Sequence, residues 1–206
     1  MTKSLTKRLL VAVAGGCLLV GVAGTAAIAE EQVGGDSDVD VTVDIAPITA
    51  PGSLTMTVAG SSAVLTESDS TPAVRQFTGE LPTVTVTDTR EAAEVPDGSY
   101  WYVLGTATAF NGEDGQDPIT ADHLGWTPSL LTPSENGEVV EGFPVDTSLD
   151  PEPNNVGLVD KELLAMASTS EEALGSWQVT ADVNLKVPVE TAGGSYSSTL
   201  TLSLFE

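Results

Sequence analysis

The chain has 206 residues, with 30 Asp and Glu against 7 Lys and Arg, so its formal net charge at pH 7 is −23. Phosphates would repel such an acidic chain, which excludes sequence-independent binding to DNA or RNA. Hydrophobic residues make up 41% of the sequence, as in ordinary globular proteins, whereas one Cys and one His leave almost no material for a zinc, haem or thiol site.

The first 29 residues have the layout of a secretory signal peptide. A basic start, an apolar stretch and a small-x-small cleavage site follow one another as Lys3, Lys7 and Arg8, residues 9–24, and Ala27 with Ala29. A membrane anchor would need about 20 apolar residues, more than this stretch offers. Acylation at Cys17 is the other alternative, but apolar residues follow this Cys where a lipoprotein turns polar. We expect cleavage after Ala29, a secreted chain and no membrane span after cleavage.

Cleavage would leave 177 residues with no cysteine, and four bases against 30 acids, a formal charge of −26. Residues 30–37 predict a flexible lead-in, and residues 38–206 predict a single domain. An exported domain without disulfides depends on its core, and a chain of this length buries roughly 70% of its extended-chain surface on folding. The sequence therefore predicts a domain that is stabilised by packing alone.

Most of the mature chain alternates apolar and polar residues, the pattern of half-buried β-strands. Such runs cover residues 39–45, 54–58, 84–87, 177–187 and 200–204, and residues 101–110 fit a central strand that is covered on both faces. Residues 160–174 hold the only helical material, although a short strand over 163–167 is an alternative. Residues 144–155 predict a long surface loop. We expect an all-β fold, an antiparallel β-sandwich of about seven to nine strands with at most one short helix.

His123 is the sole candidate general base. No Gly-x-Ser-x-Gly motif accompanies it, and the only Cys lies in the leader, so we interpret His123 as a solvated loop residue and expect no enzymatic activity. Asp88 and Arg90 lie two residues apart on one face. We interpret them as an exposed ion pair that defines a turn and contributes about 0–1 kcal/mol.

Oxygen-bearing side chains cluster in one loop, which contains Asn111, Glu113, Asp114 and Asp117. Calcium takes six to eight oxygen ligands, so this loop is a candidate calcium site, with Asp36, Asp38 and Asp40 as a second group. Neither segment has EF-hand spacing, and Asn-Gly and Asp-Gly are also ordinary hairpin turns. A solvated turn is the alternative, and no other cofactor is expected.

Six aromatic residues are candidates for a sugar-stacking face. They are Trp101, Trp126, Trp177, Tyr100, Tyr102 and Tyr196. Trp177 heads the most regular alternating run, so core packing is the better interpretation for it. Tyr100 and Tyr102 should lie on the face opposite Trp101, and carbohydrate stacking there stays open.

The second half of the chain resembles the WxL domain family of Gram-positive surface proteins. That family carries a Trp-x-Leu motif and a distal Tyr-x-x-x-(Leu/Ile/Val)-Thr-Trp-x-Leu motif. The matching residues here are Trp101 and Val103 for the first motif, and Tyr196, Leu200, Thr201, Leu202 and Leu204 for the second. Val103 replaces the family's Leu, and Leu202 replaces its second Trp. The resemblance covers residues 39–206 and implies an immunoglobulin-like or WxL-like sandwich that associates non-covalently with the cell wall.

Three functions follow as hypotheses. The first is a secreted, non-catalytic module at the cell surface or in the cell wall, whose partners are wall glycan, peptidoglycan or another surface protein. The second is a released ligand-binding or adhesion module stabilised by calcium. The third is a secreted glycan hydrolase, which would need two carboxyl groups paired across a cleft. Recovery in washed walls, a melting temperature that rises with calcium, and turnover of a polysaccharide distinguish the three.

Overall fold

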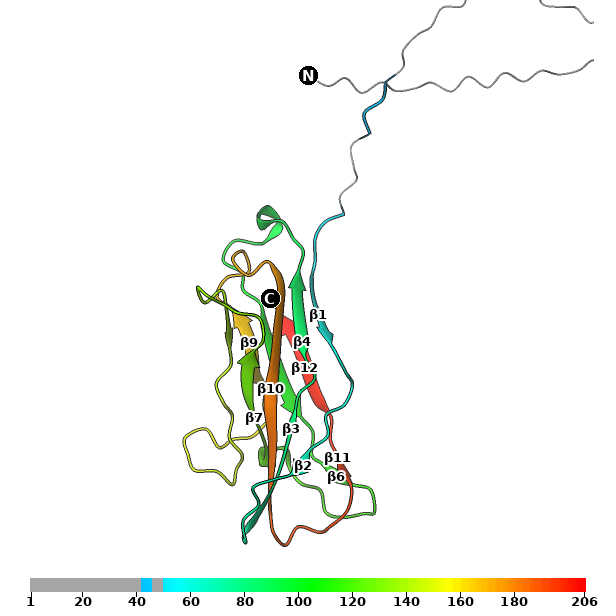
Figure 1. Cartoon of the computed structure of the whole chain (residues 1–206), viewed down its shortest axis with the longest axis vertical. Helices are drawn as coiled ribbons and strands as arrows, with labels where there is room; N and C mark the ends of the chain where they lie inside the picture. The colour runs from blue at the N-terminus through cyan, green and yellow to red at the C-terminus, as the bar shows by residue number, and fades with distance from the viewer. Residues whose placement is uncertain (1–41, 46–49) are drawn as a thin grey trace, which may run out of the picture. The chain divides into compact units, whose positions relative to one another are not determined.

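The computed structural model describes residues 42–45 and 50–206 (Figure 1). The predicted signal peptide with its cleavage site at Ala27 and Ala29, the lead-in over 30–37 and the acidic group of Asp36, Asp38 and Asp40 lie outside the described residues. The predicted strand over 39–45 is wrong in the part that is described. Residues 42–45 pair with no strand among the described residues, and Val43 and Ile45 are both 80% exposed.

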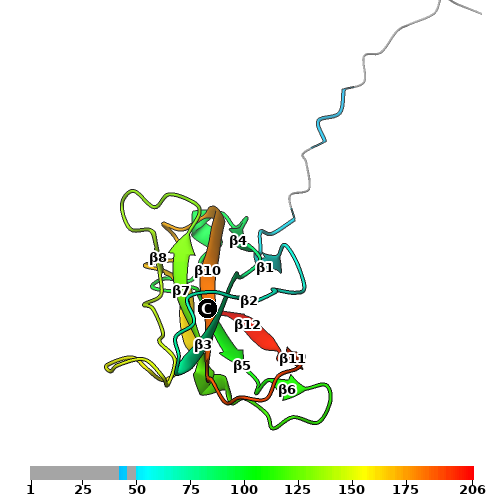
Figure 2. The ribbon, with the colours of Figure 1, turned by 60° about the horizontal axis from the view of Figure 1, so that its bottom comes forward.

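The sandwich prediction is confirmed, because the remaining residues form antiparallel sheets and contain no α-helix. One sheet contains β1 (Leu54–Val58), β2 (Thr66–Glu67), β3 (Val74–Glu80), β4 (Val84–Asp88), β7 (Leu124–Leu130) and β10 (Gly175–Pro188). The other contains β5 (Tyr102–Ala107), β8 (Val139–Glu141), β9 (Glu162–Ala167) and β12 (Leu200–Phe205). A small pair, β6 (Asn111–Gly112) with β11 (Tyr196–Ser197), lies beside β12 (Figure 2). Two 3₁₀ turns complete the described part, η1 (Ala92–Glu94) and η2 (Ala121–His123).

The strand count exceeds the prediction because β2, β6 and β11 have only two residues each, too short to show an alternating pattern in the sequence. The helical interpretation of residues 160–174 is wrong, and the strand alternative is correct, since β9 covers Glu162–Ala167. Tertiary pairing decides this case, because β9 lies between β5 and β8 and hydrogen-bonds to both. The segment over residues 144–155 contains no strand, but the expectation of a surface loop is only partly correct. Val145 forms an isolated bridge with Trp126, and Val145 and Thr147 are buried.

β10 runs the length of the larger sheet (Figure 1). One of its edges pairs with β7, and the other pairs first with β4 and then with β3. The residues that face inward are all buried, namely Val179, Ala181, Val183, Leu185 and Val187. The alternation in the sequence therefore fixes which face of β10 lies in the core, as predicted.

The second sheet has the order β12-β5-β9-β8, so β5 is a central strand, as predicted. The expectation that both of its faces are covered is wrong, because Tyr102 and Leu104 on its outer face are only half-buried. Its buried residues Val103 and Gly105 face the larger sheet. The ring of Trp126 in β7 lies over Gly105, where an added Cβ would stand only 2.4 Å from a ring carbon. Glycine at this position therefore makes room for the tryptophan.

Trp101 and Trp126 are each 1% exposed and belong to the core between the sheets. Among the described residues, neither indole N–H has a hydrogen-bond partner, so packing alone holds both rings. The sequence-based idea that they contribute to a sugar-stacking face is wrong for these two. Trp177 is half-buried against the core and donates its Nε1–H to the carbonyl of Ala173 at 2.9 Å. Core packing was the better interpretation for that residue.

The ion pair of Asp88 and Arg90 is largely buried, so the prediction of an exposed pair that defines a turn is wrong. The side chain of Asp88 is 1% exposed, and Arg90 donates to both of its carboxylate oxygens, at 2.9 and 2.6 Å. Arg90 also donates to both oxygens of Glu206, at 2.8 and 2.7 Å. The ends of β4 and β12 are thereby joined across the two sheets. We call this part of the sandwich, formed by Asp88, Arg90, Trp101 and Glu206, the closed end.

Candidate functional site

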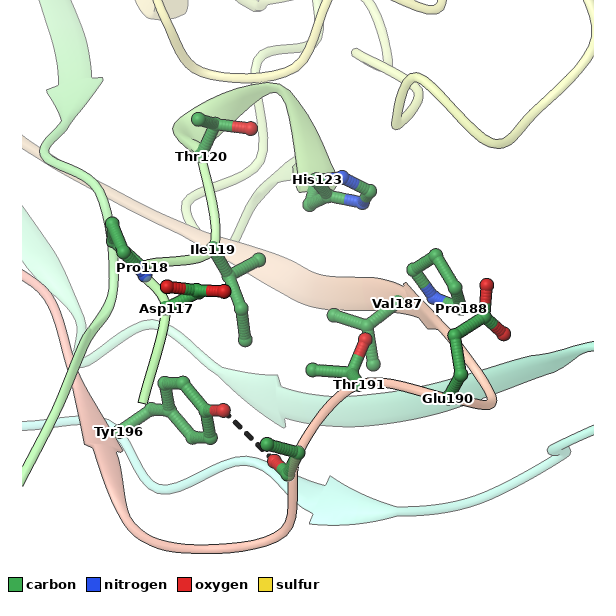
Figure 3. Close-up of a pocket in the computed structure, with 11 residues that line it drawn as sticks. Asp117, Pro118, Ile119, Thr120, His123, Val187, Pro188, Glu190, Thr191 and Tyr196 are labelled. Carbon is green, nitrogen blue, oxygen red and sulfur yellow. Dashed lines mark hydrogen bonds between the residues drawn. The ribbon is translucent and has the colours of Figure 1, made fainter. Parts of the chain in front are cut away.

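A pocket of about 330 Å³ contains the only histidine of the chain (Figure 3). His123 ends η2 and is half-buried, because its Nδ1–H donates to the backbone carbonyl of Lys186 in β10 at 2.7 Å. The interpretation of His123 as a solvated loop residue is therefore wrong. The carbonyl can only accept, so Nδ1 carries the proton and Nε2 of the neutral ring is left as an acceptor.

The other polar groups of this pocket are not arranged around His123. Asp117 and Glu190 lie on opposite sides of the pocket in Figure 3, and the hydroxyl of Tyr196 donates to the carbonyl of Ala192 at 2.8 Å. In residues 42–45 and 50–206, no serine or threonine hydroxyl is hydrogen-bonded to the imidazole. A general base needs a positioned proton donor, and a nucleophile needs an adjacent base. The pocket geometry therefore supports no specific reaction.

Lys186 links this pocket to the long loop over residues 144–155. Its ammonium group donates to the carboxylate of Asp150, which also accepts from the hydroxyl of Thr147 at 2.7 Å. Burial would raise the pKa of Asp150, but the hydrogen bonds from Lys186 and Thr147 outweigh it and the pKa is lowered. The pair of Lys186 and Asp150 anchors the loop over residues 144–155 on the larger sheet. It also occupies one of the four basic residues of the expected mature chain.

The predicted calcium loop forms a turn in which two polar groups make local hydrogen bonds. Asn111 lies in β6 and donates its amide to the carbonyl of Ala109 at 3.3 Å, while the backbone N–H of Asp114 donates to the side chain of Gln116 at 2.9 Å. In the part of the chain that the structure describes, no three His, Cys, Asp or Glu side chains are placed to hold a metal ion, and this includes Glu113, Asp114 and Asp117. The geometry gives the calcium hypothesis no support.

The residues that resemble the two WxL motifs lie on neighbouring strands. Val103 of β5 is the cross-strand partner of Leu204 in β12, and Leu202 is the partner of Gly105. Trp101 and Val103 are buried in the core, and Leu200, Leu202 and Leu204 are half-buried against it. Thr201 faces the other way and is exposed, and Tyr196 lies in β11 just before β12. The apolar motif-like residues of β5 and β12 therefore serve packing within this sandwich, whereas Thr201 does not.

The outer face of the smaller sheet carries a row of aromatic and apolar side chains. Phe205 of β12 is the partner of Tyr102 in β5, Tyr102 that of Met166 in β9, and Met166 that of Val140 in β8. Because directly opposite residues of an antiparallel pair point to the same face, the row crosses all four strands. None of these four side chains is buried. We call Tyr100, Tyr102, Phe205, Met166 and Val140 the aromatic row.

The aromatic rings of this row are ordered by contacts with one another. Tyr102 and Phe205 are stacked, with ring centroids 5.3 Å apart and an angle of 16° between the planes. Tyr100 lies 5.9 Å from Tyr102 and is 48% exposed, and the ammonium group of Lys161 lies 5.0 Å from the centroid of Phe205. Such a surface offers flat apolar faces together with one cation.

Sequence reasoning found part of this surface. Tyr100 and Tyr102 were placed opposite Trp101, and the structure confirms this, since Trp101 is buried and Tyr100 is half-exposed. Phe205 and Lys161 were missed. The signal for Phe205 was present, because the alternation Leu200, Leu202, Leu204 sends residue 205 to the outer face. Nothing in the sequence places Lys161 over its ring.

Comparison of the chain with protein-family models, with curated proteins and with solved structures finds no match. The resemblance to the WxL family thus stays a prediction that rests on the quoted residues. Within residues 42–45 and 50–206, no helix has the length and apolar character needed to cross a membrane.

Proposed function

We propose that the protein is a secreted, non-catalytic module that associates non-covalently with the Gram-positive cell wall in an interaction or structural role. The observation that supports it best is the aromatic row on the outer face of the smaller sheet. Stacked aromatic rings that remain partly exposed bind the apolar faces of sugar rings. The row would be the contact surface, and wall glycan its ligand.

The charge of the protein favours one class of wall component as the ligand. A mature charge of −26 would be repelled by the phosphates of wall polymers, so an anionic ligand is unfavourable. Stacking between a sugar and an aromatic ring is insensitive to net charge, and Lys161 provides a local positive charge at the row. A neutral or zwitterionic glycan, such as peptidoglycan, fits these two conditions.

The proposal is tested by sedimentation of the purified mature chain with washed Gram-positive cell walls. We expect the wild-type protein to sediment with the walls and Tyr100→Ala to remain mainly in the supernatant. Leu131→Ala is the matched control, because Leu131 is also 48% exposed but directly follows β7 of the other sheet. Equal sedimentation of the two variants, or a wild-type protein that does not sediment, would rule the aromatic row out as the contact.

A chelator added to the same assay separates two ways of binding the wall. Direct stacking on glycan predicts unchanged sedimentation, whereas attachment through bridging divalent cations predicts release into the supernatant. A melting temperature measured with and without calcium accompanies this assay. A steep rise with calcium would favour the alternative of a calcium-stabilised module, which the loop of Asn111 to Asp117 does not support by its geometry.

A further inference from the structure

One side of the sandwich is open between its two sheets. A groove of about 890 Å³ lies there, lined on the larger sheet by Met56, Phe77 and Leu185 and on the smaller sheet by Leu200 and Leu202. All of these residues pack against the core, yet most remain only half-buried. Apolar surface left in contact with water in this way is unfavourable, and a contiguous groove of it marks a binding site.

Both strands that border the groove are end strands. In the part of the chain that the structure describes, β1 ends one sheet and β12 ends the other, so each has an edge that pairs with no strand. The free edge of β12 presents a row of backbone N–H and C=O groups that can hydrogen-bond to an added strand. Groove and edge together have the form of a site for β-strand addition, in which the edge supplies backbone hydrogen bonds and the groove receives alternate side chains.

The same chain contains a segment with the matching pattern. Residues 39–45 read Val-Asp-Val-Thr-Val-Asp-Ile, seven residues against the six of β12, with every second residue apolar. Val43 and Ile45 are each 80% exposed, although β-branched residues in strict alternation are typical of a half-buried strand. As an added strand, this segment would turn its valines and isoleucine into the groove and leave Asp40, Thr42 and Asp44 in water.

The path of the chain before β1 favours insertion into a second copy. Ser53 and Gly52 are held at the closed end, where Ser53 exchanges hydrogen bonds with Thr89 and Gly52 donates to Glu94. An added Cβ on Gly52 would stand 2.2 Å from the Cα of Arg90, so the backbone is pressed against that end. The groove begins at the opposite end of β1, at Val58 and Gly60. Gly52 and Ser53 are thus held at one end of β1, whereas the groove opens toward its other end, and this separation favours a groove in a second copy.

We propose that residues 39–45 of one molecule add as a β-strand to the free edge of β12 in a second copy and fill the groove there. Each molecule then gives one strand and receives one. Such a head-to-tail contact is heterologous, because it joins two different surfaces of the molecule. The product is a ring of copies if the rotation between neighbouring molecules closes the assembly, and a linear chain otherwise. This inference does not depend on wall binding, and its test uses purified protein without walls.

The test measures the mass of the chain from Glu30 to Glu206 by sedimentation velocity over a hundredfold range of concentration. We expect oligomers that grow with concentration. Val43→Asp places a charge on the inserting face and should give monomers, whereas Thr42→Asp adds the same charge on the outer face and should assemble as the wild type does. Both positions are exposed in the single molecule, so neither substitution affects folding of the sandwich.

A mixing experiment identifies the acceptor. Val64 lines the groove and is 79% exposed, so Val64→Asp places a negative charge at the rim of the groove, unfavourable for an apolar and acidic strand, without disturbing the core. This variant keeps its donor segment, and Val43→Asp keeps its groove. Each should be monomeric alone, and an equimolar mixture should form a one-to-one complex and nothing larger, because no further donor or groove is left.

Three results would overturn the proposal. One is a wild-type chain that stays monomeric with unprotected amides at residues 42–45 in hydrogen exchange. Another is a monomer in which these amides are protected, which would mean that the segment occupies the groove of its own molecule. The third is assembly that Val43→Asp and Thr42→Asp weaken equally, which would point to repulsion by charge in place of strand insertion.

Discussion

The closed end and the groove belong to one sandwich of alternating strands, but their apolar side chains are covered to different extents. At the closed end, Trp101 is 1% exposed, and the ions of Asp88, Arg90 and Glu206 join the two sheets. At the groove, Met56 and Phe77 reach the core and remain half-buried. Alternation sets which face of a strand is apolar, and the neighbouring elements determine whether that face is sealed.

The comparison suggests a division of roles, with the closed end providing stability and the groove remaining available for a partner. Burial of a large side chain is what stabilises a core, so truncations should cost much more at one place than at the other. The four predictions below test this difference, and the largest effects are expected at the closed end.

The largest expected effect is that of Trp101→Ala. Loss of a fully buried tryptophan should lower the free energy of unfolding by about 3–5 kcal/mol, because a cavity remains where the ring was. Phe77→Ala at the groove should cost about 1–2 kcal/mol, since a half-buried ring gains less on folding. Urea unfolding followed by tryptophan fluorescence and circular dichroism gives both values. Equal losses would mean that the groove is part of the stabilising core.

The second prediction concerns the ion cluster of the closed end. Arg90→Gln leaves the carboxylate of Asp88 buried with its main partner removed, which should cost about 3–5 kcal/mol in the free energy of unfolding. The hydrogen bonds to Asp88, and then those to Glu206, raise the pKa of Arg90, so this cation persists at any working pH.

Arg75→Gln is the matched control for that experiment. Arg75 forms the same kind of two-point pair with Glu67, at 2.9 and 2.8 Å, but at the solvent-exposed edge where β2 meets β3. Its removal should change the unfolding midpoint far less. A control that is as unstable as Arg90→Gln would show that burial of the pair at the closed end is unimportant.

The third prediction tests how closely the two sheets pack between these regions. Gly105→Ala places a methyl group 2.4 Å from a ring carbon of Trp126, so the ring or the strand has to move. Overpacking of this kind typically costs about 1–3 kcal/mol. Gly193→Ala is the control, because Gly193 has an ordinary φ and an added Cβ there meets no other atom. Gly98 also has open space, but its positive φ of 73° would strain an alanine. Thermal unfolding of Gly105→Ala and Gly193→Ala measures the difference.

The sequence predicted the strands and the two-sheet fold because alternation is a local signal. Residues 177–187 alternate without interruption, and β10 follows them closely. The same signal misled at residues 39–45, where the pattern is equally regular but the structure supplies no pairing strand to residues 42–45. Alternation records that a segment is suited to be a half-buried strand, and it contains no information about where the partner strand lies.

The candidate site was less predictable, because it depends on contacts across long distances in the chain. Arg90 and Asp88 are neighbours in sequence, but Glu206 joins them only through the packing of the two sheets against each other, so the burial of the pair was missed. Phe205 and Lys161 meet for a similar reason. The acidic loop of Asn111 to Asp117 shows the opposite case, since closeness in sequence did not bring its carboxylates into a metal-binding group.

The smallest predicted effect is a pH dependence that originates at the closed end. The hydrogen bonds from Arg90 lower the pKa of Glu206 below its ordinary value of 4.5, and they outweigh the opposing effect of burial. A carboxyl group whose pKa is lower in the folded than in the unfolded chain stabilises the fold above pH 4.5, and this contribution is lost as the pH falls through the folded pKa. In Glu206→Gln that contribution is absent. The difference in unfolding free energy between wild type and Glu206→Gln should therefore be largest near pH 7 and shrink steadily below pH 4.5. A difference that stays constant down to pH 3 would mean that Glu206 acts through packing and that its charge does not help to seal the closed end.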